Sequence, residues 1–178
     1  MQFSLLRAGI AIAICAATVS PSRAQDFGAA FSGFDTGSSD PIQIEADKLE
    51  VRDPEKLAVY SGNVRVRQGG TLLEAPTLQV FYSGEATPEG VPGSQVSRIE
   101  AGPGVTVRSG DQTASGDTAI LDMDRDMITM SGNVVLTQGP NVVRGERLVV
   151  DLATREGRIE GGRVQTLIAP AAGRPPAQ

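Results

Sequence analysis

Histidine and tryptophan are absent from the 178 residues, and Cys15 is the single cysteine. Without histidine the chain cannot form a Ser-His-Asp triad, a Cys-His pair or a histidine-ligated metal site. Lys and Arg number 16 against 21 Asp and Glu, so the generally basic surface of a nucleic-acid-binding protein is missing. Aromatic residues make up only 4%, whereas Gly numbers 21 and Pro 11. This balance favours many short strands and turns over long helices. From the residues that are missing, we expect no catalytic residue, no cofactor and no metal.

Residues 1–24 have the pattern of a cleaved signal peptide. Arg7 precedes an apolar run from Ala8 to Val19, which is shorter than the roughly 20 residues that span a bilayer. Pro21 ends this run, and Ser22-Arg23-Ala24 supplies the small residues that a signal peptidase requires. The alternative is an uncleaved N-terminal anchor. A lipoprotein signal fits less well, because Cys15 lies inside the apolar run.

The rest of the chain divides into three parts. Residues 25–40 form a Gly/Ser/Asp-rich segment that we expect to be a flexible lead-in. Its three phenylalanines have near-helical spacing and offer a docking alternative, which the glycines between them disfavour. We expect residues 41–169 to form the folded domain and residues 170–178 to form a disordered tail.

Within 41–169 apolar and polar residues alternate with a period of two, as in Val64 and Val66 or Leu148 and Val150. This period indicates β-strands. Turn signals interrupt it every seven residues or so, among them Ser61-Gly62-Asn63 and Ser131-Gly132-Asn133. We therefore predict an all-β fold of about sixteen short antiparallel strands.

The sequence also contains an internal repeat. Residues 43–81 fall on 113–151 without a gap, with nine identities that include Asp47/Asp117 and both Ser-Gly-Asn-Val segments. A second similarity pairs residues 98–102 with 158–162, which are 60 positions apart and not 70. A Gly/Pro-rich loop at 84–94 in the first copy accounts for this difference in spacing. Such repeats are typical of stacked units that share one core.

The segments Ile42-Gln43-Ile44-Glu45-Ala46-Asp47, Tyr60-Ser61-Gly62-Asn63-Val64 and Val66-Arg67-Gln68-Gly69 resemble the LptA/OstA family of lipopolysaccharide-transport proteins. The resemblance covers about 41–169. It implies an elongated antiparallel β-jellyroll, a twisted V open at both ends, which is located in the periplasm. It also implies that lipopolysaccharide slides along the apolar interior from the inner to the outer membrane. The implied partners are lipopolysaccharide, membrane components of the transport system and further copies stacked head to tail.

Aliphatic strands suit a carrier, because burying acyl chains requires an apolar trough. Plain core packing is the simpler interpretation of each single position. The predicted lipid-binding groove consists of inward-facing aliphatic residues, namely Leu49, Val51, Leu57, Val59, Val64, Val66, Leu78, Val80, Leu121, Met123, Met127, Val134, Leu136, Leu148 and Val150.

The ends of the open sheet are predicted docking sites, because unpaired edge strands accept further strands. The predicted end-strand docking residues are Ile42, Ile44, Val164 and Leu167. The alternative is that the lead-in or the tail caps these edges. Arg65 and Arg67 alternate with the valines beside them, so they belong to the opposite face, where they are solvated or meet lipid phosphates.

Two other function classes stay open. The first is a self-associating β scaffold without lipid binding, which shares the repeat and the end strands. The second is a glycosidase with paired carboxylates such as Asp122 and Asp124. Residues 122–126 are more simply a solvated turn, and for Ca²⁺ they lack the glycine and distal glutamate of an EF-hand loop.

Overall fold

The computed structural model describes residues 40–84 and 95–169. The predicted signal peptide, the lead-in before Asp40, the loop after Gly84 and the predicted tail lie outside the described residues.

The described chain consists of antiparallel β-strands and one 3-10 turn, η2 (Asp53–Glu55). The twelve strands are β1 (Gln43–Glu45), β2 (Lys48–Arg52), β3 (Leu57–Gln68), β4 (Thr71–Ser83), β5 (Gln95–Gly102), β6 (Val105–Ser109), β7 (Gln112–Gly116), β8 (Thr118–Asp122), β9 (Met127–Gln138), β10 (Asn141–Asp151), β11 (Glu156–Glu160) and β12 (Gln165–Leu167).

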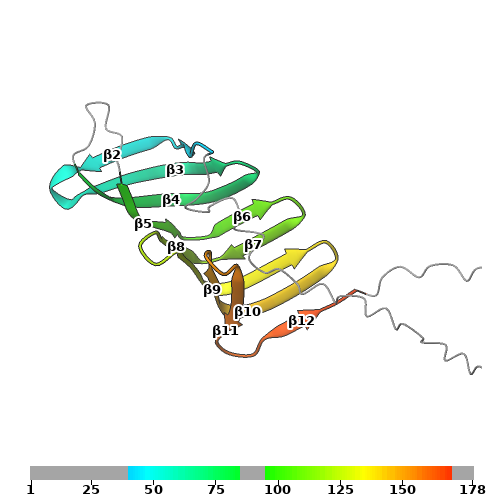
Figure 1. Cartoon of the computed structure of the whole chain (residues 1–178). Coiled ribbons are helices and arrows are strands. Elements are labelled where there is room, and N and C mark those ends of the chain that lie inside the picture. Colours follow the sequence, from blue (N-terminus) through cyan, green and yellow to red (C-terminus); the bar gives the residue numbers. More distant parts are fainter. Residues whose placement is uncertain (1–39, 85–94, 170–178) are drawn as a thin grey trace, which may run out of the picture.

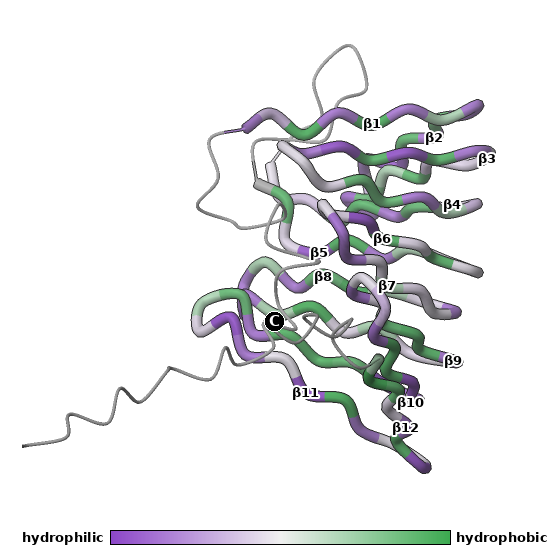
Figure 2. The backbone as a smooth tube through the Cα atoms, turned by 90° about the vertical axis from the view of Figure 1, so that its right-hand side faces the viewer, coloured by the Kyte–Doolittle hydropathy of each residue, from purple (hydrophilic) through white to green (hydrophobic). Residues whose placement is uncertain are grey.

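All twelve strands belong to one sheet, which is folded along its length into two leaves. Leaf 1 has the order β1-β3-β4-β6-β7-β9-β10-β12, and leaf 2 has the order β2-β3-β4-β5-β8-β9-β10-β11. The long strands β3, β4, β9 and β10 run through both leaves, so they join them. Figure 2 shows the strands stacked from β1 to β12, with β5, β8 and β11 of leaf 2 set apart from the strands of leaf 1. The all-β antiparallel jellyroll predicted from the sequence is confirmed.

The strand number differs from the expected sixteen for a specific reason. Ser61-Gly62-Asn63 and Ser131-Gly132-Asn133 do not end strands; they lie inside β3 and β9. The pairing of β3 with β4 shifts register between Ser61 and Val64, as it does at a β-bulge. Because β3, β4, β9 and β10 each contribute a segment to both leaves, twelve strands supply sixteen segments, eight in each leaf.

The internal repeat corresponds to a repeated structural unit. The unit formed by β1, β2, β3 and β4 recurs as β7, β8, β9 and β10, in the same order. The second similarity, of 98–102 with 158–162, lies on the corresponding strands β5 and β11. The pairing of β11 with β10 is shifted by two residues relative to the pairing of β5 with β4. Ile99 pairs with Val80, whereas Ile159 pairs with Leu148, the repeat equivalent of Leu78. The repeat therefore holds through β4, and the last strand of each unit follows its own register.

The core lies between the two leaves and runs along the whole stack. Leu78, Met130, Leu148 and Val150 are fully buried there, together with inward residues of every long strand. Their alternation with exposed residues is visible in β4, where every second side chain from Leu78 to Tyr82 is buried. Each leaf thus has one apolar face turned toward the other leaf and one face turned to solvent.

Candidate functional site

The fold line between the leaves is built by the same contact in both repeats. The Asn63 amide donates to the Asp47 carboxylate at 2.8 Å, and the Asp47 backbone N–H donates to the Gly62 carbonyl at 2.9 Å. Gly62 and Asn63 have φ values of 80° and 47°, a region in which Gly and Asn are the residues with least strain. This local chemistry bends β3 and so creates an interior between the leaves.

The interior face of leaf 1 carries a continuous apolar row across the stack. Cross-strand pairing places its members opposite one another from β1 to β10. Because paired residues share a face of the sheet, the row forms one apolar surface along the protein. Its members are Ile44, Val66, Leu73, Val107, Ala114, Leu136 and Val143.

A small apolar cavity lies between the leaves. Its volume is about 40 Å³, which is room for a few water molecules. Val66 and Leu73 line it from leaf 1, and Ile99, Leu121 and Ile128 line it from leaf 2. The cavity marks a place where the two apolar faces are not fully packed against each other.

Most of the predicted groove residues face this interior. Val64, Val66, Leu78, Val80, Leu121, Val134, Leu136, Leu148 and Val150 are buried in the core, and the partly buried Val51 and Met123 pack against it.

The remaining four predicted positions are outside this core cluster. Leu49, on edge strand β2, pairs with Tyr60 of β3, which packs against the core, so Leu49 shares the inward face but is 42% exposed at the edge. Leu57 and Val59 flank the core residue Ala58, and Met127 precedes the core residue Ile128, so these three lie on the opposite strand face. Leu57 is nevertheless buried there, at 8% exposed. The runs there are apolar on both faces, so period two alone does not identify the inward residue.

Several interior residues were missed by the sequence analysis. Leu73, Ile99, Val107 and Ile128 line the cavity, although none belongs to the predicted groove. The alternation of Val105 with Val107 was a usable signal for that strand. Ile99 has the same signal, because it lies between Arg98 and Glu100. Leu73 has none, because it follows the apolar Leu72 and its inward direction depends on the register with β6.

Both ends of the stack present edge strands with exposed apolar side chains. At one end β1 and β2 pair only with β3 among the described strands, and at the other β11 and β12 pair only with β10. Ile42 is 41% exposed at the first end. At the other end Val164, Leu167 and Ile168 are exposed, with Leu167 at 65%. The predicted docking residues therefore lie at the two edges, with Ile44 partly buried against the core.

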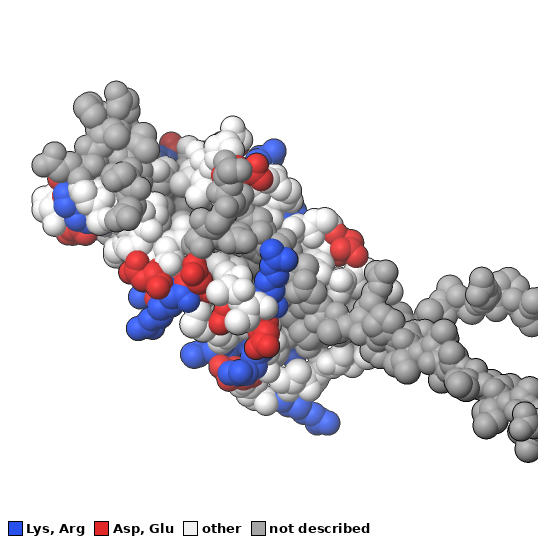
Figure 3. Space-filling model, viewed as in Figure 1, with Lys and Arg blue, Asp and Glu red and all other residues white. Residues whose placement is uncertain are grey.

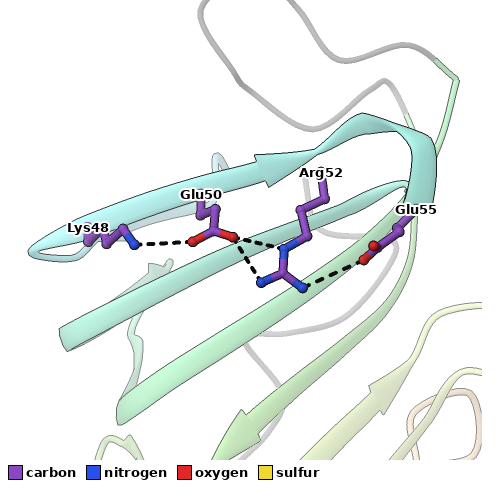
Figure 4. Close-up of polar contacts among 4 residues, drawn as sticks. All are labelled: Lys48, Glu50, Arg52 and Glu55. Carbon is purple, nitrogen blue, oxygen red and sulfur yellow. Dashed lines mark hydrogen bonds and ion pairs between the residues drawn. The ribbon is translucent and has the colours of Figure 1, made fainter.

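The outer faces carry charges of both signs, interspersed over the face seen in Figure 3. On edge strand β2, Glu50 accepts from Lys48 at 3.1 Å and from Arg52 at 2.9 Å (Figure 4). The hydrogen bond from Arg52 has the larger effect and the one from Lys48 the next, and together they hold the pKa of Glu50 below its usual value. On leaf 1, Arg65 and Arg108 both pair with Glu74. Exposed pairs of this kind add little stability, but charged side chains protect an edge such as β2 from unspecific pairing.

Residues 123–126 form the turn between β8 and β9, as the simpler interpretation predicts. Asp122 accepts a hydrogen bond from the Arg125 backbone at 3.1 Å, so its carboxylate has a role in the turn. Across 40–84 and 95–169, no group of three or more acidic or cysteine side chains gathers in a way that could hold a metal ion. Those residues also contain no helix long and apolar enough to cross a membrane.

The described residues thus form an antiparallel β-jellyroll with an apolar interior and two open edges. Residues 43–156 match the family described as LptA/(LptD N-terminal domain) LPS transport protein. The chain belongs to this family, which confirms the resemblance seen in the sequence.

The chain is also similar to individual proteins and to a solved structure. An uncharacterised protein of Rhizobium meliloti (strain 1021) is 36% identical over 170 residues, which are 93% of this chain and 91% of the relative. The LPS-assembly protein LptD of Mannheimia succiniciproducens is 44% identical over 45 residues, 25% of this chain and 6% of that protein. The crystal structure of LptH, the LptA homologous periplasmic component of the lipopolysaccharide transport device of Pseudomonas aeruginosa, superimposes with a TM-score of 0.61 at 20% identity. The match covers 74% of this chain and 96% of LptH, and it shows the common fold.

Proposed function

We propose that this protein is a periplasmic carrier that binds lipopolysaccharide through the acyl chains of lipid A and passes it from the inner to the outer membrane. The observation that carries the proposal is the apolar row of leaf 1, which continues from Ile44 at one edge to Val143 near the other. An apolar surface that runs along the stack from β1 to β10 allows a lipid to move along it without entering water.

The energetics favour a sheltered route. Burying one methylene contributes roughly 0.8 kcal/mol, so exposing a twelve-carbon chain to water costs on the order of 10 kcal/mol. The cavity between the leaves, at about 40 Å³, is much smaller than such a chain. Loading therefore requires the leaves to move apart at their free tips, while the corner contacts of Asp47 with Asn63 and Asp117 with Asn133 hold the fold line.

The edges supply the connection to partners. Strand addition at β1/β2 and at β11/β12 would join copies of the protein head to tail, and would join the end copies to transport components in the two membranes. A signal peptide at 1–24 would deliver the chain to the periplasm. The role is that of a carrier and involves no catalysis.

Site-specific photo-crosslinking tests the proposal. A photo-reactive residue at Val66 or Leu136 faces the interior, whereas its neighbours Arg65 and Val135 face outward. Exposed to purified lipopolysaccharide, the two inward positions should form adducts and the two matched outward positions should not. A folded protein without adducts at either inward position would contradict lipid binding and would favour a self-associating scaffold.

A further inference from the structure

The free edge of leaf 1 carries a row of uncharged polar side chains that point into the interior. These residues flank the three hairpin tips at 69–70, 110–111 and 139–140, which lie side by side along one side of the protein (Figure 1). Cross-strand pairing connects them without a gap from β3 to β10. We name this row the amide rim, and its members are Gln68, Thr71, Ser109, Gln112, Gln138 and Asn141.

The inward direction of the rim follows from strand alternation. Gln68 is two residues from the core residue Val66, Gln112 is two from Ala114, and Gln138 is two from Leu136. Gln68 and Gln112 are only 6% and 5% exposed, and Thr71 is 2% exposed. Apart from Tyr82, these three are the buried polar side chains of the described residues. Gln68 also borders the apolar cavity.

Two neighbouring sets of residues show that packing alone does not require a polar rim. One step deeper in leaf 1, the adjacent inward row from Val66 to Val143 is apolar at every position. The free edge of leaf 2, opposite the rim, presents Tyr82, Val96, Met123 and Leu152 to the core. The opening between the free edges of the two leaves is called the mouth here. It is amphipathic, with an amide and hydroxyl edge on leaf 1 and a mainly apolar edge on leaf 2.

Hydrogen bonds keep the rim in place. Gln68 donates to the Asp40 carbonyl at 3.2 Å, and Thr71 and Ser109 bond through their hydroxyls at 3.1 Å. At the other end Asn141 accepts from the Ala169 backbone N–H at 3.2 Å. Buried polar groups cost free energy when such bonds are missing. An apolar residue at these positions would avoid that cost, and the polar rim instead provides amide and hydroxyl groups for a polar ligand between the free edges.

We propose that the amide rim binds the sugar hydroxyl and amide groups of the glycolipid headgroup while its acyl chains lie in the interior; this rests on the proposed function. Amides and hydroxyls both donate and accept hydrogen bonds, which suits sugars. Phosphate groups are bound preferentially by arginine and lysine, and the rim has neither. The neutral rim also lets an anionic lipid slide from one amide to the next, because no strong ion pair forms along the path.

The test compares two lipids on the full mature protein. One is lipid A, which has sugars, and the other is a phosphatidate with two twelve-carbon chains, which has a phosphate but no sugar. The variants are Gln112→Met and Gln138→Met, singly and combined, because methionine keeps the length of glutamine. The matched controls are Thr113→Val and Thr137→Val, which lie on the outer face of the same hairpins. Gln138 is only partly buried, so its single variant tests the rim even if Gln112→Met fails to fold.

Each hydrogen bond to the sugar that a rim variant loses should weaken its binding of lipid A about tenfold. Their affinity for the phosphatidate should stay within about twofold of the wild-type value, and both controls should bind both lipids normally. An equal loss for the two lipids, or no loss for either, would overturn the rim proposal. Wild-type protein that binds neither lipid would instead contradict the proposed function.

Discussion

Asp117 and Asn133 form the second copy of the corner contact that bends the sheet. The Asn133 amide donates to the Asp117 carboxylate at 3.1 Å, and the Asp117 backbone N–H lies 3.0 Å from the Ser131 carbonyl and 2.9 Å from the Gly132 carbonyl. The same contact joins Asp47 to Asn63, 70 positions earlier in the chain. The repeated Asp and Ser-Gly-Asn segments are thus corner motifs, which hold the two leaves at their common fold line.

The corner motif makes a first prediction. Asn133→Gly keeps the positive φ of 47° accessible but removes the amide, so it should lower the free energy of unfolding by about 1 kcal/mol. Asn133→Ala should cost about 1 kcal/mol more, because alanine is strained at this φ. Urea unfolding of both variants measures the two contributions.

Asp117→Ala removes the acceptor of the same bond. Its effect should not add to that of Asn133→Gly, because the two variants delete one interaction. Asp111→Ala, at an exposed hairpin tip, serves as the control and should leave stability unchanged. Full additivity of the two corner variants would mean that the side-chain bond does not stabilise the bend.

The internal repeat makes a second prediction about the core. Leu78 and Leu148 are repeat equivalents, and both are fully buried. Leu78→Ala and Leu148→Ala should each destabilise the protein by about 2–5 kcal/mol and by similar amounts. Leu167→Ala, at a residue that is 65% exposed, should have little effect. Thermal unfolding compares the three, and a marked difference between the two core variants would show that the repeats do not pack equivalently.

The exposed C-terminal edge makes a third prediction. Replacing Leu167 and Ile168 by lysine places charges at the end of edge strand β12 and directly after it, where they oppose strand addition. The double variant should lose self-association in analytical ultracentrifugation, while its unfolding temperature stays that of the wild type. Val135→Lys adds a charge to the outer face of leaf 1 away from either edge and should associate normally. Unchanged association of the double variant would exclude this edge as the interface.

Asp151 makes a fourth prediction, on pH. Its carboxylate accepts from the Thr154 backbone N–H at 2.9 Å, which lowers its pKa below the usual 3.8. The folded state then binds its proton less readily than the unfolded state, so the stabilisation is complete above the usual pKa and is lost as the pH falls through the lowered one.

Asp151→Asn should therefore be less stable than the wild type at about pH 6, and the difference should shrink toward about pH 3. Urea midpoints measured across that range give the comparison. A constant deficit of the Asp151 variant would assign the effect to packing and not to titration.

The amino-acid sequence by itself determined the class of the fold, because strand alternation and the repeat of 43–81 in 113–151 are local or linear patterns. It also placed the segments at both edges. Only the tertiary structure decided that Ser61-Gly62-Asn63 bends a strand and does not end it, because that depends on the partner Asp47, which lies between β1 and β2. It likewise decided which face of 57–59 and 127–128 is inward and that six polar residues form one rim, because cross-strand register brings together side chains that are far apart in the chain.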